Sequence, residues 1–165
     1  MTDISPLESG QPVIVDNVLY HANSIVATWM HDKMGETQLV ETGFRAFGII
    51  DPASKSERIS ERIIAGAYFH SHKDINGWRD ITVAVAMQPE AMIHPKSIKR
   101  ILEYPFTQLG LPGISAEIDI GNLNAVKGAG DLGFELIGTK RLAGANGGDV
   151  GVFRLYPDKC PFWKD

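Results

Sequence analysis

The order of helix-like and strand-like segments constrains the fold of this chain more than any other feature. Residues 13–34 carry apolar side chains at spacings of three and four, which predicts an amphipathic helix that Gly35 ends. Strand-like segments follow at 39–51, 62–72 and 80–87, separated by turn-rich stretches. The first half of the chain therefore predicts a sheet with a helix packed against it.

The second half of the chain alternates between the two kinds of segment. Residues 95–109 predict a second helix, in which Pro105 removes a backbone hydrogen bond, so we expect a kink or a break there. A strand, a short helix and the two strands of a terminal hairpin follow, at residues 113–120, 123–132, 134–142 and 149–156. Elements in this order predict an α/β fold built on a mixed sheet.

Length and composition indicate one domain spanning residues 1–165. The chain has 165 residues, of which 44% are hydrophobic, enough to bury roughly two thirds of its unfolded surface. A net charge of −4 disfavours broad nucleic-acid binding, and no apolar run reaches the ~18 residues that span a bilayer. Cys160 is the sole cysteine, and the sequence opens without a charged-then-apolar leader, so we expect a cytoplasmic protein.

The stretch IDIGNLNAVKGAGDLGFELIG, residues 118–138, passes from a strand-like run through two asparagines into a helix with few side chains. It contains an Asn, an Ala three positions on, Gly-Phe at eleven and twelve, and a Gly four residues after the Phe. These positions are filled by Asn122, Ala125, Gly133, Phe134 and Gly138. The pattern resembles the closing motif of the GNAT superfamily of acyl-CoA-dependent N-acyltransferases. The resemblance spans roughly residues 40–156, and YPFTQLG at 104–110 resembles divergent GNAT-like proteins of bacteriophages and bacteria.

The resemblance implies a cofactor and a place for it. In the GNAT fold the fourth and fifth strands, here 80–87 and 113–120, splay apart at their C-terminal ends and hold the pantetheine arm of CoA. We therefore expect acetyl-CoA as acyl-donor cosubstrate, with contacts from Met87, Gln88, Asn122 and Asn124. The small residues at 128–130 leave space for the thioester and the acceptor. The asparagines have an alternative role as helix caps.

The loop after the fourth strand departs from the family pattern. Most GNATs carry glycines there, whose backbone N–H groups hold the pyrophosphate at a helix start. Here the loop QPEAMIHPKSIKR has no glycine, and polar side chains cluster at the helix start instead: Lys96, Ser97, Lys99 and Arg100. We expect these to bind the phosphates in place of the glycines. The alternative is the solvated face of an amphipathic helix.

The acid and base of the reaction also need substitutes. Many GNATs place a Tyr seven residues after the motif Asn to protonate the leaving thiolate, and Ala129 stands there in this chain. A thiol pKa near ~8.5 puts the thiolate only about 2 kcal/mol uphill at neutral pH, so water can supply the proton. Glu117 and then Asp119, on one face of the predicted fifth strand, are the candidate bases. The alternative is that each pairs with a nearby Arg or Lys.

These features lead to one function and two alternatives. The first is an acetyl-CoA-dependent N-acyltransferase that acts on a primary amine of a small molecule, peptide or protein, either as a monomer or as a homodimer. The alternatives are a degenerate GNAT-like binding or assembly module and a nucleobase modifier of the phage Mom type. If a phage encodes the chain, the compartment is the host cytoplasm. His70 and His72 have zinc-like spacing, but a third ligand is missing, so we predict no metal site.

Overall fold

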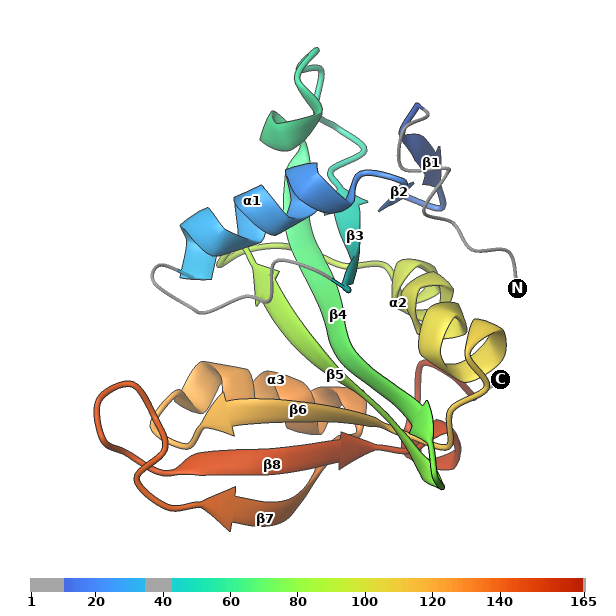
Figure 1. Cartoon of the computed structure of the whole chain (residues 1–165). Helices are drawn as coiled ribbons and strands as arrows, with labels where there is room; N and C mark the ends of the chain where they lie inside the picture. Colours follow the sequence, from blue (N-terminus) through green and yellow to red (C-terminus); the bar gives the residue numbers. More distant parts are fainter. Residues whose placement is uncertain (1–10, 35–42, 165) are drawn as a thin grey trace. The chain divides into compact units, whose positions relative to one another are not determined.

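A computed structural model describes residues 11–34 and 43–164 of the chain (Figure 1). The chain divides into two compact units, Met1–Ser71 with Ala84–Glu103 and His72–Val83 with Tyr104–Asp165. Strands β4 and β5 contribute residues to both units. Within the described ranges, no helix is long and apolar enough to cross a membrane.

The described strands form one mixed sheet in the order β1-β2-β3-β4-β5-β6-β8-β7. The strands are β1 (Val13–Val15), β2 (Val18–Tyr20), β3 (Arg45–Ile50), β4 (Ile63–Ile75), β5 (Trp78–Met87), β6 (Ile114–Asp119), β7 (Glu135–Lys140) and β8 (Val150–Leu155). The helices are α1 (Asn23–Met34), α2 (Pro95–Glu103) and α3 (Leu123–Leu132). Strands β5 and β6 are parallel, whereas β2-β3, β3-β4, β6-β8 and β8-β7 are antiparallel. The predicted α/β fold with a mixed sheet is confirmed.

A β-hairpin replaces the first part of the helix predicted at 13–34. Strands β1 and β2 pair antiparallel, with Val15 opposite Val18. The two residues between them, Asp16 and Asn17, have φ of 52° and 65°. Two-residue hairpin turns of type I′ need positive φ at both positions, and Asp and Asn tolerate it, so the turn forms where helical spacing was expected. The helix prediction is wrong before residue 23 and confirmed from Asn23 to Met34, and its expected end at Gly35 lies outside the described residues.

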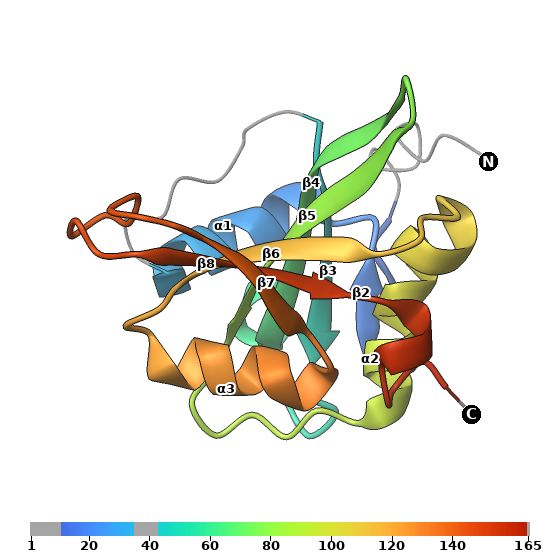
Figure 2. The same cartoon turned by 90° about the horizontal axis from the view of Figure 1, so that it is seen from below.

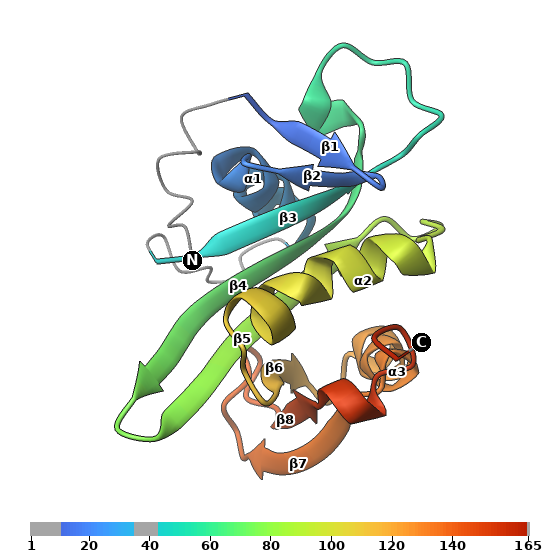
Figure 3. The same ribbon diagram turned by 90° about the vertical axis from the view of Figure 1, so that its right-hand side faces the viewer.

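The core of the first unit lies between α1 and the strands beside it. A Cβ at Gly66 would lie 2.8 Å from Met30, and one at Gly48 would lie 3.2 Å from Val26, so these glycines allow α1 to approach the sheet closely. Figures 1 and 3 show α1 and α2 on opposite sides of β3 and β4. The buried cluster comprises Leu19, Ala22, Val26, Met30, Ala46, Ile50, Ile63, Tyr68 and Ala86.

The break predicted at Pro105 is confirmed. Helix α2 ends at Glu103, and a π-helical turn follows at Tyr104–Gln108 with Pro105 buried inside it. Proline has no N–H to donate to the carbonyl four residues earlier, so the α-helical pattern cannot continue through it. The expected strand at 39–51 lies partly outside the described residues, and β3 begins at Arg45.

The second unit contains β6, β8 and β7, with α3 running alongside them (Figure 2). The predicted terminal hairpin is confirmed, since β7 and β8 pair antiparallel. One face of these strands is buried and carries Ile114, Ala116, Phe153 and Leu155. Cys160, fully buried, lies against the end of α3, because the Cys160 Cα is 3.2 Å from where a Gly133 Cβ would stand.

The parallel pairing between β5 and β6 is short. The structure records one paired position, Thr82 with Ser115, although β5 continues to Met87 and β6 to Asp119. The recorded pairing is therefore confined to the beginning of β6.

Candidate functional site

Helix α3 begins as the sequence predicts, with Asn122 as its N-cap. The Asn122 side chain accepts a hydrogen bond of 3.2 Å from the Ala125 N–H, so the capping role is confirmed. Asn124 lies exposed in the first turn. A Cβ added to Gly128 or Gly130 would meet no atom within 4 Å. The exposed side of α3 therefore offers open space at Gly128 and Gly130 and an exposed carboxamide at Asn124.

The side chain at the missing tyrosine position points away from that space. Ala129 is buried, with 8% of its surface exposed, between the two open glycines. A larger side chain there would enter the apolar interior of the second unit. The register of this helix thus gives the chain no replacement for the tyrosine at position 129.

The two candidate bases on β6 already have partners. The Glu117 carboxylate lies 2.9 Å from the Lys140 Nζ, with both side chains about half exposed. Asp119 Oδ1 accepts a 2.8 Å hydrogen bond from the Gly121 N–H. Asp119 thereby fixes the turn that leads into α3, and Glu117 forms an exposed ion pair. Their catalytic assignment stays a prediction.

The start of α2 is closed by its own residues. His94 Nδ1 accepts from the Lys96 N–H at 3.0 Å, and the His94 carbonyl accepts from the Ser97 N–H at 2.9 Å. Pro95, the first helical residue, has no N–H. The backbone donors that other helix starts offer to an anion are therefore satisfied or missing here. A phosphate at this helix would depend on side chains.

The expected phosphate-binding side chains gather around Asp16, in the β1-β2 turn. Asp16 accepts from Arg100 Nε at 2.8 Å, its other oxygen lies 3.6 Å from Lys96 Nζ, and its carbonyl accepts from Ser97 Oγ at 2.6 Å. Ser97 is 1% exposed, and its assignment to the cofactor site stays a prediction. Lys96 stays 68% exposed, and Lys99 is half-buried on the same helix. The hydrogen bond from Arg100 holds the pKa of Asp16 below its ordinary value of 3.8, against an opposing effect of burial.

This lowered pKa predicts a pH-dependent contribution to stability. Ionised Asp16 stabilises the folded chain above pH 3.8, and the contribution is lost as the pH falls through the lowered pKa of the folded state. Asp16→Asn should therefore be less stable than the natural protein at pH 7, with the difference shrinking in acid. Denaturant unfolding of both proteins between pH 7 and about pH 3 measures it. A difference that stays constant over this range would contradict the assignment.

Two expected cofactor contacts lie at the end of β5. Met87 is 52% exposed. Gln88 is fixed to the start of β4, because its N–H donates to the Ile64 carbonyl at 2.9 Å and its side chain to the Ile63 carbonyl at 3.2 Å. The Gln88 carbonyl accepts from the Ala91 N–H, which closes a turn. Met87 is the freer of the two to contact a ligand.

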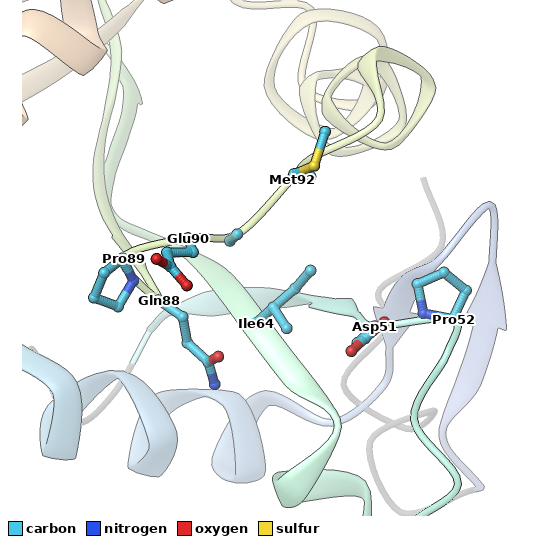
Figure 4. Close-up of a pocket in the computed structure, with 8 residues that line it drawn as sticks. Asp51, Pro52, Ile64, Gln88, Pro89, Glu90 and Met92 are labelled. Carbon is cyan, nitrogen blue, oxygen red and sulfur yellow. The ribbon is translucent and has the colours of Figure 1, made fainter.

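The loop after β5 borders a pocket of about 600 Å³ in the first unit (Figure 4). Two carboxylates, Asp51 and Glu90, line it, together with the Gln88 carboxamide and apolar side chains that include Ile64 and Met92. No lysine or arginine is among its lining residues. Both charged lining residues are acidic, a charge that disfavours an anion such as phosphate.

A polar cluster that the sequence analysis missed joins three strands of the second unit. Asp80 on β5 accepts hydrogen bonds from Ser115 on β6 and from Arg154 on β8. Ser115 also accepts from Arg154 at 2.8 Å. The Asp80 and Arg154 side chains are only 31% and 15% exposed. This cluster holds β5 to β6 beside their one paired position. The only local signal was Asp80 at the start of an apolar strand.

The histidine pair does not have the geometry that its spacing suggested. Ser71, between His70 and His72, has φ of 58°, which interrupts the alternation of a regular strand. The Ser71 hydroxyl lies 2.8 Å from His70 Nδ1. Among the described residues, no group of three or more His, Cys, Asp or Glu side chains could hold a metal ion.

Comparison with known proteins identifies the fold. No protein-family model and no curated protein matches the sequence. A chain of the NatC complex bound to Gag peptide and CoA matches with TM-score 0.61 at 12% identity, over 88% of this chain and 96% of that chain. The fold is that of the GNAT acetyltransferases. A chimera of spermidine N-acetyltransferase SpeG from Vibrio cholerae and hSSAT matches with TM-score 0.54 at 20% identity, over 77% and 72% of the two chains. A probable acetyltransferase matches with TM-score 0.55 at 16% identity, over 81% and 69%.

The GNAT fold relates β6, α3 and the loop after β5 to known positions in its element order. In its element order β6 is the fifth strand and α3 the helix that follows it. The capped start of α3 and its open glycines therefore stand in the motif that the sequence analysis identified. The loop after β5 and the start of α2 occupy the position of the GNAT glycine loop, and this loop contains no glycine.

Proposed function

We propose that this protein is an acetyl-CoA-dependent N-acyltransferase that acts on a primary amine. One observation carries the proposal: α3 of a GNAT fold starts with an Asn122 cap and presents the unobstructed positions Gly128 and Gly130. An acceptor and a thioester need such space beside this helix. The structural neighbours include enzymes whose names give spermidine as substrate, which supports an amine without naming the acceptor.

The proposal assigns the cofactor's parts to different side chains. Met87, Gln88, Asn122 and Asn124 are assigned to the pantetheine arm, whose amides exchange hydrogen bonds with carboxamides and backbone. Lys96, Lys99 and Arg100 are assigned to the phosphates through charge-assisted hydrogen bonds. The His94 cap supports side-chain recognition, since it leaves few backbone donors at the start of α2. Acetyl-CoA supplies the activated acyl group.

The chain's own carboxylates are assigned to the acceptor. An amine is protonated at neutral pH and must lose a proton before its nitrogen attacks the thioester carbonyl. The C–N bond then forms, the attacking nitrogen gives up its second proton to water, the C–S bond breaks, and the thiolate takes a proton from water. Glu117 is proposed as the base, assisted by the negative charge of Asp119, which also attracts a cationic acceptor. In this assignment Lys140 leaves Glu117 when the acceptor binds.

The first test is direct. Titration calorimetry with acetyl-CoA should show binding, and incubation with labelled acetyl-CoA and a panel of polyamines, amino acids and peptides should show transfer to an amine. Glu117→Gln should then lower kcat by about a hundredfold, the usual size of a general-base contribution, and leave the KM for acetyl-CoA nearly unchanged.

Lys140→Met is the matched control for this variant, because it removes the same ion pair and keeps the carboxylate. It should retain most of the wild-type kcat. If Glu117→Gln and Asp119→Asn both turn over at the wild-type rate, neither carboxylate takes part in the reaction.

A binding module is the second candidate, and particular contacts favour it. Asp16 holds Arg100 and Lys96, His94 caps α2, and carboxylates line the pocket at the loop after β5. A chain that has lost phosphate recognition would show such features. Failure to bind acetyl-CoA in the calorimeter at millimolar concentration would favour this candidate over the enzyme.

A further inference from the structure

Strand β7 presents an uncovered edge in the second unit. It stands at one end of the strand order, and β8 is its partner on one side (Figure 1). No other strand in the described ranges pairs with it. All six of its residues are exposed, including Leu136 at 54% and Ile137 at 53%. Such an edge, with free backbone groups and apolar side chains, favours the addition of another strand.

The charges of β7 make it complementary to itself. The strand reads ELIGTK, with Glu135 at its first position and Lys140 at its last. When two identical strands pair antiparallel around a two-fold axis, the first residue of each can lie opposite the last residue of the other. Glu135 of each copy then faces Lys140 of the other copy, which forms two ion pairs by one symmetry operation.

An irregularity in β7 makes this register geometrically allowed. In a regular strand, residues 135 and 140 lie five apart and project from opposite faces, so they could not meet across a two-fold axis perpendicular to the sheet. The pairing of β7 with β8 shifts between Leu136 and Gly138. Glu135 lies opposite Arg154, and Lys140 lies opposite Val150. Arg154 and Val150 are four apart on one face of β8, so Glu135 and Lys140 share that face.

We infer that two copies of this chain associate through β7, in an antiparallel register that places Glu135 opposite Lys140 and Ile137 opposite Gly138. The two sheets become continuous across the contact. Leu136 lies on the other face, opposite Thr139 of the second copy. Without an acceptor, Lys140 also lies 2.9 Å from Glu117 of its own chain, so each lysine of the dimer lies between two carboxylates.

The edge at β1 is a weaker place for the same contact. It has only three residues, Val13, Ile14 and Val15, and none of them is charged. A three-residue strand gives few hydrogen bonds, and without charges no register is preferred over its neighbours. The occupant that fits β7 is thus a second β7.

Sedimentation velocity at increasing protein concentration tests the inference without reference to catalysis. The natural protein should dimerise. Glu135→Lys and Lys140→Glu each replace two attractive contacts with two repulsive ones and should raise the dimer dissociation constant about tenfold or more. An equimolar mixture of the two variants restores both opposite-charge pairs and should form a heterodimer, visible by native mass spectrometry. Glu57→Lys, an exposed reversal outside β7, is the control and should dimerise normally.

Each outcome bears on the inference. Circular dichroism melting should confirm that the variants fold. A natural protein that stays monomeric at hundreds of micromolar overturns the inference. So does a dimer that both reversals leave intact, because its interface then lies elsewhere. Dimerisation without acetyl-CoA binding would leave the β7 contact standing while the proposed enzyme activity fails.

Discussion

Gly133→Ala should lower the free energy of unfolding by about 3 kcal/mol. Gly133 ends α3 with φ of 102°, a conformation that L side chains rarely adopt, and its N–H donates to the Ala129 and Gly130 carbonyls. A Cβ there would stand 2.6 Å from the Lys159 carbonyl oxygen. The strain of the positive φ and the close contact therefore add together. The two nearest backbone atoms, the Lys159 carbonyl oxygen and the Cys160 Cα, cannot move away as the end of a flexible side chain can. Urea unfolding at neutral pH measures the loss.

Gly128→Ala in the same helix is the matched control. It adds the same methyl group where no atom lies within 4 Å, and alanine is the better helix former. We expect this variant to be more stable by about 0.5–1 kcal/mol. Equal destabilisation by the two substitutions would mean that α3 does not end as described.

Asp80→Ala should cost about 2 kcal/mol of stability. It leaves Arg154 with 15% of its side chain exposed and without its carboxylate, and it removes the acceptor of the Ser115 hydroxyl. Loss of one partner from a fully buried pair costs more, about 3–5 kcal/mol, and the partial exposure of Asp80 reduces the figure. Urea unfolding measures this variant as well.

Glu117→Ala provides the comparison on the same sheet face. Its ion pair with Lys140 is about half exposed, so its removal should cost no more than about 0.5 kcal/mol. In the double variant Asp80→Ala/Arg154→Met, the loss should be smaller than the sum of the two single losses, because no charge is left unpaired. An additive double variant would show that Asp80 and Arg154 do not act together.

The parts of the fold that follow from local signals were predictable. Helix α3 spans Leu123–Leu132 as expected, because Asn122 and Gly133 mark its two ends within the sequence itself. The β1-β2 hairpin was missed because apolar residues on both sides of a two-residue turn happened to match helical spacing. The Asp16–Asn17 pair was the overlooked signal.

The candidate site was less predictable, because its contacts join distant residues. Arg100 meets Asp16 across 84 positions and Arg154 meets Asp80 across 74. The sequence showed that α2 begins with cations, but not that a carboxylate from a hairpin turn would lie among them. It also placed Glu117 on a strand face without showing that Lys140 would share that face.

Because Cys160 is buried, the reactivity of its thiol can report local unfolding near the end of α3. It is the only cysteine in the sequence, and none of its surface is exposed. A thiol reagent can therefore reach sulfur only when the region around the end of α3 opens, so the labelling rate under native conditions reports the free energy of that opening. Two cysteines introduced on the surface, one in each unit, would carry labels without competition from the buried natural thiol, which makes distance measurements between the two units practical.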